Sequence, residues 1–431
     1  MPPVQLSELQ TALCIVFLLV APLALAGIAL MSTGLGRSRN AAHSMLAALC
    51  VIAVAACTYF FIGTALQGSG DRAGFVIWLG GKPWSVAGKG HFMLMGLPLN
   101  AAPAVLVAWL GILSAALAGL IPLGSGADRW RLPAICASTA LLSGITFPLF
   151  AHWSWGGGWL AQLGANYGLG IGYLDAGGAG AIHVLGGFTA LSLTWLLGAR
   201  RGKYTSDGMP MAIPGHNAVF VLFGALLALV GWLGLNGAGA MLFAGVEPAR
   251  LPLVALNTLL CAAGAAWAAA LTTRIRYTKP DASLTANGWT GGLAASSACC
   301  AFIAPAAALI VGFVAGALVA FSVELLDLRL DVDDPGGSVS VHALGGVWGL
   351  LAVGLFGRME AGGPGQLLAQ VVGIATLLGF ILPVTWGLNW LLNRAVPGRV
   401  SAEGEHQGMD LYELGAGAYP EFVTHADEFM R

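Results

Sequence analysis

The residues best placed to do chemistry in this sequence are two histidines that head matching motifs. Seven residues separate Asp175 from His183-Val-Leu-Gly-Gly, and seven separate Asp334 from His342-Ala-Leu-Gly-Gly. Each histidine stands at the head of an apolar stretch that could cross a bilayer, where an ionisable side chain is expensive and usually functional. A matched pair at corresponding points of two halves is typical of internally repeated membrane folds whose substrate path lies between the repeats.

The chemistry open to such a pair follows from the imidazole ring. A neutral ring offers one donor and one acceptor, so two facing rings can share a proton and present nitrogen lone pairs or N–H groups to a small polar solute such as ammonia. Two alternatives remain open: each histidine is a packing residue bonded to a carbonyl, or the pair ligates a metal or haem. Ligation usually needs further ligands at close spacing, so we expect no metal and no cofactor.

Three other side chains could act at the two ends of a passage through the membrane, either by capping helices or by attracting a cation. Asp175 and Asp334 precede their histidines closely enough to cap a helix amino end and complement its dipole, and Asp175 could also attract a cation. Trp155, in Trp155-Gly-Gly-Gly, could hold a cation by a cation–π contact worth about 0.5 to 2 kcal/mol. The alternative for Trp155 is an anchoring role at headgroup depth.

Composition places the chain in the membrane. Of its 431 residues 57% are hydrophobic and 9% are charged, against roughly a quarter charged in a soluble domain, and the mean hydropathy is +0.80. The net charge is −1 and the sequence has no run of basic residues, so nothing in its charge pattern indicates nucleic-acid binding. The sequence therefore predicts an all-α polytopic membrane protein.

Eleven apolar runs are long enough to cross about 30 Å of hydrocarbon as helices. They lie near 9–32, 42–66, 93–122, 132–151, 180–199, 216–237, 250–273, 286–302, 304–326, 340–357 and 366–394. We divide the chain into a transmembrane domain, 1–394, and a polar tail, 395–431, too short to fold as an enzyme domain. The eighth run is the least secure, because it is short and rich in small residues.

The basic residues orient these spans. With the amino terminus outside and the carboxyl terminus inside, only five of the 19 Lys and Arg residues fall in outer loops: Arg72, Lys82, Lys89, Arg250 and Arg358. This asymmetry obeys the positive-inside bias. We therefore expect a multi-pass protein of the cell inner (plasma) membrane.

Taken together, the motifs resemble the ammonium transporter family (Amt/Mep/Rh), and its Amt branch most. Besides the two histidine motifs and Trp155-Gly-Gly-Gly, the resemblance rests on three segments: Gly34-Leu-Gly-Arg-Ser-Arg-Asn40, Gly231-Trp232-Leu-Gly-Leu235-Asn236-Gly, and the tail from Arg399-Val-Ser through Gly408-Met-Asp410 to Tyr419. It runs from the first span to about Pro420 and is specific as a set.

The resemblance implies a homotrimer of eleven-helix protomers. Each protomer has its own pore between two inverted five-helix halves, here about 9–199 and 216–357, followed by a final helix, 366–394. It implies that ammonium is recruited at an outer aromatic site, loses its proton and passes the twin histidines as ammonia. Carried over by motif, the pore residues are His183, His342, Trp232 and Leu235, with Trp155 and Asp175 at the outer mouth. Asp334 and Asn236 take structural roles, and the acidic tail resembles the family's segment that couples to a PII-class signal protein.

The sequence departs from the family at the outer mouth. Leu110 and Ser114 stand where the family has phenylalanines, Leu235 replaces the gate phenylalanine, and Gly239 replaces a small hydroxyl residue. About eight extra residues, around 165–173, also precede Asp175. These changes predict weaker cation capture and keep three functions open: a low-affinity ammonia channel, which we favour, a carrier for another small amine, or an ammonium sensor or receptor-like relative.

Overall fold

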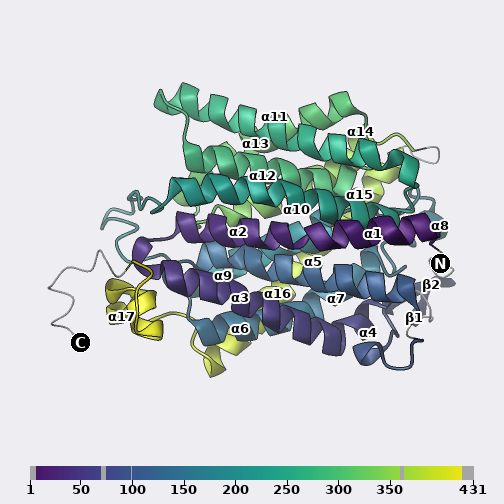
Figure 1. Ribbon diagram of the computed structural model, residues 1–431, viewed down its shortest axis with the longest axis horizontal. Helices are drawn as coiled ribbons and strands as arrows, with labels where there is room; N and C mark the ends of the chain where they lie inside the picture. Colours follow the sequence, from purple (N-terminus) through teal and green to yellow (C-terminus); the bar gives the residue numbers. More distant parts are fainter. Residues whose placement is uncertain (1–5, 69–73, 99, 360–363, 420–431) are drawn as a thin grey trace.

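The structure, a computed structural model, describes residues 6–68, 74–98, 100–359 and 364–419, and over these ranges the chain is mainly helical (Figure 1). The α-helices are α1 Glu8–Val20, α2 Pro22–Leu35, α3 Ala41–Thr58, α4 Thr64–Gln67, α5 Ala102–Gly126, α6 Leu132–Leu141, α7 Phe147–Ser154, α8 Leu163–Tyr167, α9 Leu185–Leu197, α10 Ala218–Ala244, α11 Leu251–Tyr277, α12 Ala282–Cys299, α13 Pro305–Arg329, α14 Gly345–Phe356, α15 Pro364–Thr376, α16 Leu382–Ala395 and α17 Ala402–Gln407.

Shorter helical turns join several of these helices into longer rods. The π-helical turns are η2 Tyr59–Gly63, η4 Leu142–Thr146, η5 Ala179–Val184, η7 Val339–Leu344, η8 Leu377–Ile381 and η9 Asp410–Leu414, and the 3₁₀ turns are η1 Ser38–Asn40, η3 Phe92–Leu94 and η6 Pro248–Arg250. Wide turns of the π type often mark functional positions. Both motif histidines lie in such turns, His183 in η5 and His342 in η7.

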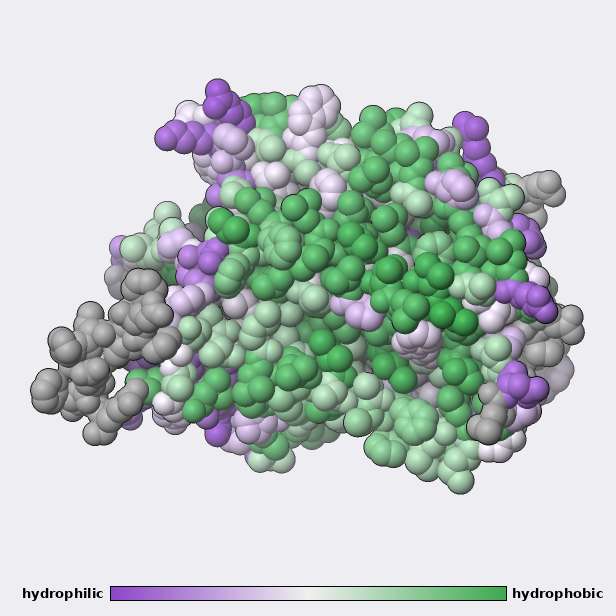
Figure 2. Space-filling model, in the orientation of Figure 1, coloured by the Kyte–Doolittle hydropathy of each residue, from purple (hydrophilic) through white to green (hydrophobic). Residues whose placement is uncertain are grey.

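Ten helical rods in the described part of the chain are long and apolar enough to cross a membrane. Their outward side chains are apolar where they would meet lipid: Leu19, Leu226 and Trp267 are exposed by 63, 60 and 65%. Figure 2 shows apolar side chains over the middle of the visible face and hydrophilic ones toward its two ends. The predicted polytopic helical fold is confirmed.

The predicted eighth span, 286–302, corresponds to α12, which ends at Cys299 and is not one of the ten rods. Its 18 residues are rich in glycine, alanine and serine, and 13 of them are buried; the helix packs against α10, α11, α13 and α14. A helix with so little contact with lipid needs little hydropathy, because neighbouring helices surround it. The count of eleven spans and the orientation of the chain stay predictions.

A β-hairpin stands in the connection between the predicted spans 42–66 and 93–122. Strands β1 Phe75–Leu79 and β2 Lys82–Ala87 pair antiparallel around Gly80-Gly81, and both glycines have positive φ, 60° and 76°, as a two-residue hairpin turn requires. In Figure 1 the hairpin and the start of α1 lie at one end of the molecule, and α17 lies at the other. We call these ends the hairpin side and the tail side.

The histidine-bearing rods cross at the centre of the molecule. Turn η5 packs on α14 while η7 packs on α9, so each histidine turn lies against the helix that follows the other. The paired glycines of the motifs allow this closeness: a Cβ on Gly187 would lie 2.5 Å from Ala343 N, and one on Gly346 would lie 2.7 Å from Ala179 O. Small residues at such crossings let membrane helices approach along their backbones.

Candidate functional site

The two motif histidines meet at this crossing. Nδ1 of His342 lies 3.3 Å from Nδ1 of His183, and the ring centroids are 5.3 Å apart at 27°. Both residues are buried, with 0 and 3% exposure. Two facing ring nitrogens at this distance must hold a proton between them, because two lone pairs would repel and two N–H groups would clash.

Two more side chains contact His183. The ring of Trp232 from α10 stacks on it at 5.1 Å and 9°, and Ser297 Oγ from α12 lies 3.3 Å from its Nε2. The Ser297 hydroxyl donates to Leu293 O at 3.2 Å. The hydroxyl oxygen can then accept a hydrogen bond from His183 Nε2–H. In this tautomer of His183, Nδ1 carries no proton and accepts a hydrogen bond from His342 Nδ1–H.

On the hairpin side, Asp175 caps the start of η5, the π-helical turn that carries His183 and continues into α9. Its carboxylate accepts from the backbone N–H groups of Gly178, Gly180 and Ala181 at 3.1, 2.9 and 3.0 Å. Gly178 makes this cap possible, because its φ of 97° lies in the region that favours glycine. Burial raises the pKa of the Asp175 carboxyl to about 6, although the backbone N–H donors partly offset that rise.

On the tail side, Asp334 caps the start of η7, the π-helical turn that carries His342 and continues into α14. Its carboxylate accepts from Ser338 N at 3.1 Å, Val339 N at 2.8 Å and Ser125 Oγ at 2.7 Å. Burial raises the pKa of Asp334 above its usual value, against the pull of these donors. In both motifs, therefore, the aspartate caps the helical turn that carries the histidine. The two turns enter the bundle from opposite sides.

Trp155 follows α7 as its C-cap residue and lies beside the cap that Asp175 forms. Its Nε1 donates to Asp175 O at 2.6 Å, and the ring of Phe243 from α10 stacks on it at 4.4 Å and 6°. The indole is therefore fixed at its edge and on one face, next to the segment that leads into η5.

The remaining residues of the predicted outer mouth lie on α5 and α10. Leu110 and Ser114 are buried, and Ser114 Oγ has no hydrogen-bond partner among the described residues. Leu235 is also buried, and a Cβ on Gly239 would clash with Ala176 O. Gly239 therefore makes room for Ala176, the residue that follows Asp175.

Asn236 joins three helices rather than lining a mouth. Its Nδ2 donates to Thr258 Oγ1 at 2.9 Å and to Ser296 Oγ at 3.1 Å. Because Ser296 neighbours Ser297, this amide fixes the part of α12 that contacts His183.

The sequence did not identify the aromatic residues that stand near the missing phenylalanines. Tyr59 from η2 packs against Gly111 of α5 and donates to Gln67 Oε1 at 2.6 Å. Its ring meets Phe147 edge-on at 5.8 Å, and Phe147 meets Trp155 at 6.3 Å. Nothing in the sequence distinguishes these aromatics from other apolar residues of their spans.

A cavity lies against His342 on its tail side. It is lined by Ile28, Met31, Ser32, Leu35, Ile121, Asn287, Thr290, Gly336, Ser338, Val341 and His342. Asn287 Oδ1 and Ser340 Oγ are buried with no partner among the described residues. The cavity places polar atoms directly beyond the histidine pair.

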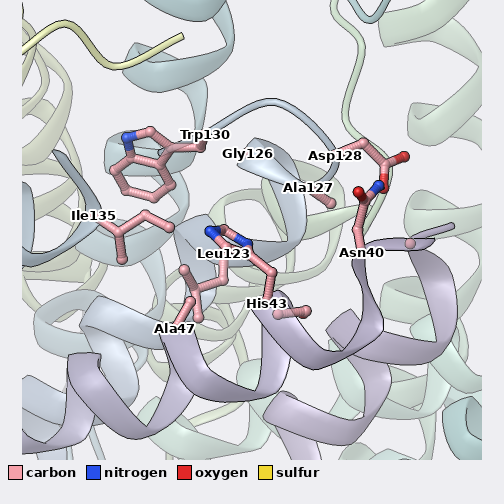
Figure 3. A pocket seen from close by; sticks show the side chains of 11 residues that line it. Asn40, His43, Ala47, Leu123, Gly126, Ala127, Asp128, Trp130 and Ile135 are labelled. Carbon is pink, nitrogen blue, oxygen red and sulfur yellow. The ribbon is translucent and has the colours of Figure 1, made fainter. Parts of the chain in front are cut away.

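A second cavity lies under the tail, lined by Gly36, Asn40, His43, Ser44, Ala47, Leu123, Gly126, Ala127, Asp128, Trp130 and Ile135. Figure 3 shows Asn40 from η1 and His43 from α3 facing Asp128 and Trp130 from the loop after α5. Asp128 and Asp333 are held by buried arginines: Arg200 contacts both, at 3.1 and 2.9 Å. Burial raises the pKa of Asp333, but Arg200 and Arg129 outweigh burial and hold it below its usual value.

The tail is docked on this surface through its acids. Asp410 accepts from His43 N at 2.7 Å and Ala42 N at 3.1 Å, which caps α3. Glu413 accepts from Leu132 N and contacts His43 Nε2, both at 2.9 Å, and Glu405 Oε1 accepts from Arg201 N at 2.6 Å. Residues 420–431, also assigned to the tail, lie outside the described residues.

These features define a polytopic helical membrane protein with a buried histidine pair between two oppositely inserted helices. The ammonium transporter family model matches residues 11–419, and the chain belongs to that family. It is 34% identical over 421 residues to the ammonium transporter Amt2 of Archaeoglobus fulgidus, covering 94% of this chain and 86% of that protein. It is 28% identical to an ammonium transporter of Bacillus subtilis, covering 91 and 94%.

Solved structures show the same fold. A structure described as a sensor Amt protein matches with a TM-score of 0.84 and 25% identity, covering 94% of this chain and 98% of that one. Mep2 of Candida albicans matches with a TM-score of 0.80 and 23% identity, covering 98 and 92%.

Proposed function

We propose that this chain moves ammonium or ammonia across the membrane through a passage lined by His183 and His342. The observation that carries the proposal is the pair of buried Nδ1 atoms 3.3 Å apart in a member of the ammonium transporter family. A neutral, dry pair can exchange hydrogen bonds with ammonia, but it offers a hydrated metal cation too few ligands to replace its water.

The proton arrangement gives each ring a distinct role in this proposal. His183 donates from Nε2 to Ser297, His342 donates from Nδ1 to His183, and Nε2 of His342 keeps its lone pair for the passing molecule. Trp232, whose buried Nε1 has no partner among the described residues, stacks on His183 and excludes water from that face. Leu235 completes the apolar wall.

Recruitment takes place on the hairpin side, which we assign to the outside on the positive-inside bias. Trp155 holds the cation against its free face, and Asp175 supplies negative potential from behind the helix cap. Leu110 and Ser114 give this mouth less aromatic surface than phenylalanines would. We therefore propose a low-affinity transporter that works as a homotrimer, with the docked tail as the place where a PII-class protein would act.

The decisive experiment uses the full chain in liposomes and measures current or flux with ammonium, methylammonium and potassium. We expect ammonium and methylammonium, but not potassium, to drive transport. His183→Ala and His342→Ala should each alter the rate or the ion selectivity, whereas His406→Ala, an exposed histidine of α17, should not. Unchanged transport in both pore variants would remove the role assigned to the pair.

A second candidate function is ammonium sensing, favoured by the likeness to the sensor Amt protein and by a tail that is bound to the bundle. A sensor would bind ammonium and change its tail contacts without steady flux. Calorimetric binding of ammonium to purified protein, together with no flux in liposomes, would support sensing over transport.

A further inference from the structure

Two glutamines of α15 hold the segment that leads to Asp175. We propose that Gln366 and Gln370 are positioning residues for the outer mouth and that they act by fixing residues 170–175 and, through them, the indole of Trp155. This inference rests on the recruitment role proposed for Trp155. The glutamines come from the last third of the chain, far in sequence from the segment they hold.

Gln370 binds both backbone groups of a single residue. Its Oε1 accepts from Leu174 N at 2.9 Å, and its Nε2 donates to Leu174 O at 2.8 Å. Nε2 also lies 3.3 Å from Leu350 O of α14. The amide, which is itself fully buried, therefore takes the place of a partner strand and satisfies both the N–H and the C=O of Leu174.

Gln366 repeats this arrangement one helical turn earlier. Its Oε1 accepts from Ile171 N at 3.1 Å, and its Nε2 donates to Gly172 O at 2.8 Å. Residues four apart lie on one face of a helix, so the two amides form a short polar ladder along α15. We call this pair the glutamine clamp.

The clamped segment continues directly into the proposed recruitment site. Leu174 is followed by Asp175, whose carbonyl accepts from Trp155 Nε1 at 2.6 Å and whose carboxylate caps η5. The segment then binds α12, with Gly177 N donating to Ser297 O at 2.5 Å. A shift of Leu174 would therefore move the acceptor of Trp155.

Tyr173 packs on α15 next to the clamp. It is buried, its ring meets Phe150 edge-on at 6.0 Å, and a Cβ on Gly373 of α15 would clash with that ring. The aromatic side chain thus fits against α15 on the same face that carries the glutamines, so the segment has one register along that helix.

The test measures methylammonium flux as a function of concentration for Gln370→Leu and Gln366→Leu, alone and combined with Trp155→Leu. Each glutamine variant should raise the half-saturation concentration about three- to tenfold, the effect of losing roughly one hydrogen bond, while the maximal rate stays within about twofold. In the Trp155→Leu background neither should raise it further, because residues that act through one group are not additive.

Gln162→Leu is the matched control. Gln162 lies on the same side and accepts from Ser85 N of β2 at 3.1 Å; among the described residues, its side chain forms no hydrogen bond with residues 170–175. This variant should keep the half-saturation concentration of the parent.

Hydrogen exchange supplies a readout that does not depend on transport. The amides of Ile171 and Leu174 should exchange faster in the clamp variants than in the parent or in Gln162→Leu. Unchanged exchange would overturn the clamp. Equal effects of Gln370→Leu in both Trp155 backgrounds would overturn its action through the indole, and a Trp155→Leu variant with unaltered half-saturation would overturn the recruitment role itself.

Discussion

Phe243 stacks on Trp155 with ring centroids 4.4 Å apart and planes within 6°, so one face of the indole is covered. In the recruitment role that we propose for Trp155, the cation would meet the opposite face. Phe243→Leu would leave the hydrogen bond to Asp175 but allow the ring to tilt. An aromatic pair contributes about 0.5 to 1.5 kcal/mol, so we expect a roughly two- to tenfold higher half-saturation concentration.

Concentration-dependent methylammonium currents would measure that change. Phe313→Leu is the control, because Phe313 pairs with Trp267 at 5.1 Å, away from the site. Equal half-saturation in Phe243→Leu and the parent would show that the stacked face does not order the indole.

The absent phenylalanines can be restored. Ser114→Phe with Leu235→Phe should improve apparent affinity by closing the mouth to water and adding aromatic surface. Because Ser114 and Leu235 are buried at 0 and 1% exposure, the larger rings also risk overpacking by about 1 to 3 kcal/mol. Flux should therefore be compared with thermal stability in detergent; a folded double variant with no gain in affinity would contradict the explanation of low affinity.

We expect the apparent affinity for ammonium to depend on pH through the carboxyl group of Asp175. Its pKa is raised to about 6 by burial, so its carboxylate is present above that pH and becomes protonated as pH falls through it. Ammonium remains protonated over this range, so only the protein changes. Apparent affinity should fall between about pH 7 and pH 5 in the parent, and the same titration should be flat in Asp175→Asn.

Ser297 is expected to fix the tautomer of His183. Ser297→Ala removes the acceptor of His183 Nε2–H, so both protonation patterns of the pair become accessible. We expect a several-fold slower flux with potassium still excluded. Ser192→Ala is the control, since Ser192 is a buried serine that bonds only to Phe188 O of its own helix among the described contacts. A rate equal to that of the parent would argue against the assigned tautomer.

The tail should be released when its cap on α3 is removed. Asp410→Ala deletes the acceptor of His43 N and Ala42 N, a loss of about 0.5 to 2 kcal/mol for a helix cap. Tryptic cleavage at Arg399 should then accelerate roughly two- to thirtyfold, because cleavage follows the population of the opened state. The exposed acid Glu403 provides the control Glu403→Ala, for which cleavage should match the parent.

The hydropathy and local motifs of the sequence were enough to predict the helical membrane fold and the two histidines of the site. Long apolar runs can cross lipid only as helices, because every backbone group must be bonded within the segment, so the multi-span helical fold followed from the sequence. The repeated Asp-x7-His-x-Leu-Gly-Gly motif identified His183 and His342 in the same way, since charge-bearing residues are rare at membrane depth. The small, glycine-rich α12 gave the weakest signal of the predicted spans, because a helix surrounded by protein carries little hydropathic signal.

The repeated motif led us to expect that the two histidines face each other, but the crossing of their two rods set the 3.3 Å contact. Only the tertiary structure decided which other side chains meet at the site. The stack of Phe243 on Trp155 and the glutamine clamp join residues far apart in the chain, and no local pattern indicates either. Gln366 and Gln370 look like ordinary polar residues of an amphipathic span until their amides are seen bonded to Ile171, Gly172 and Leu174. Local patterning fixes the elements, but the burial of specific backbone groups, which must find partners inside the fold, decides how they are placed.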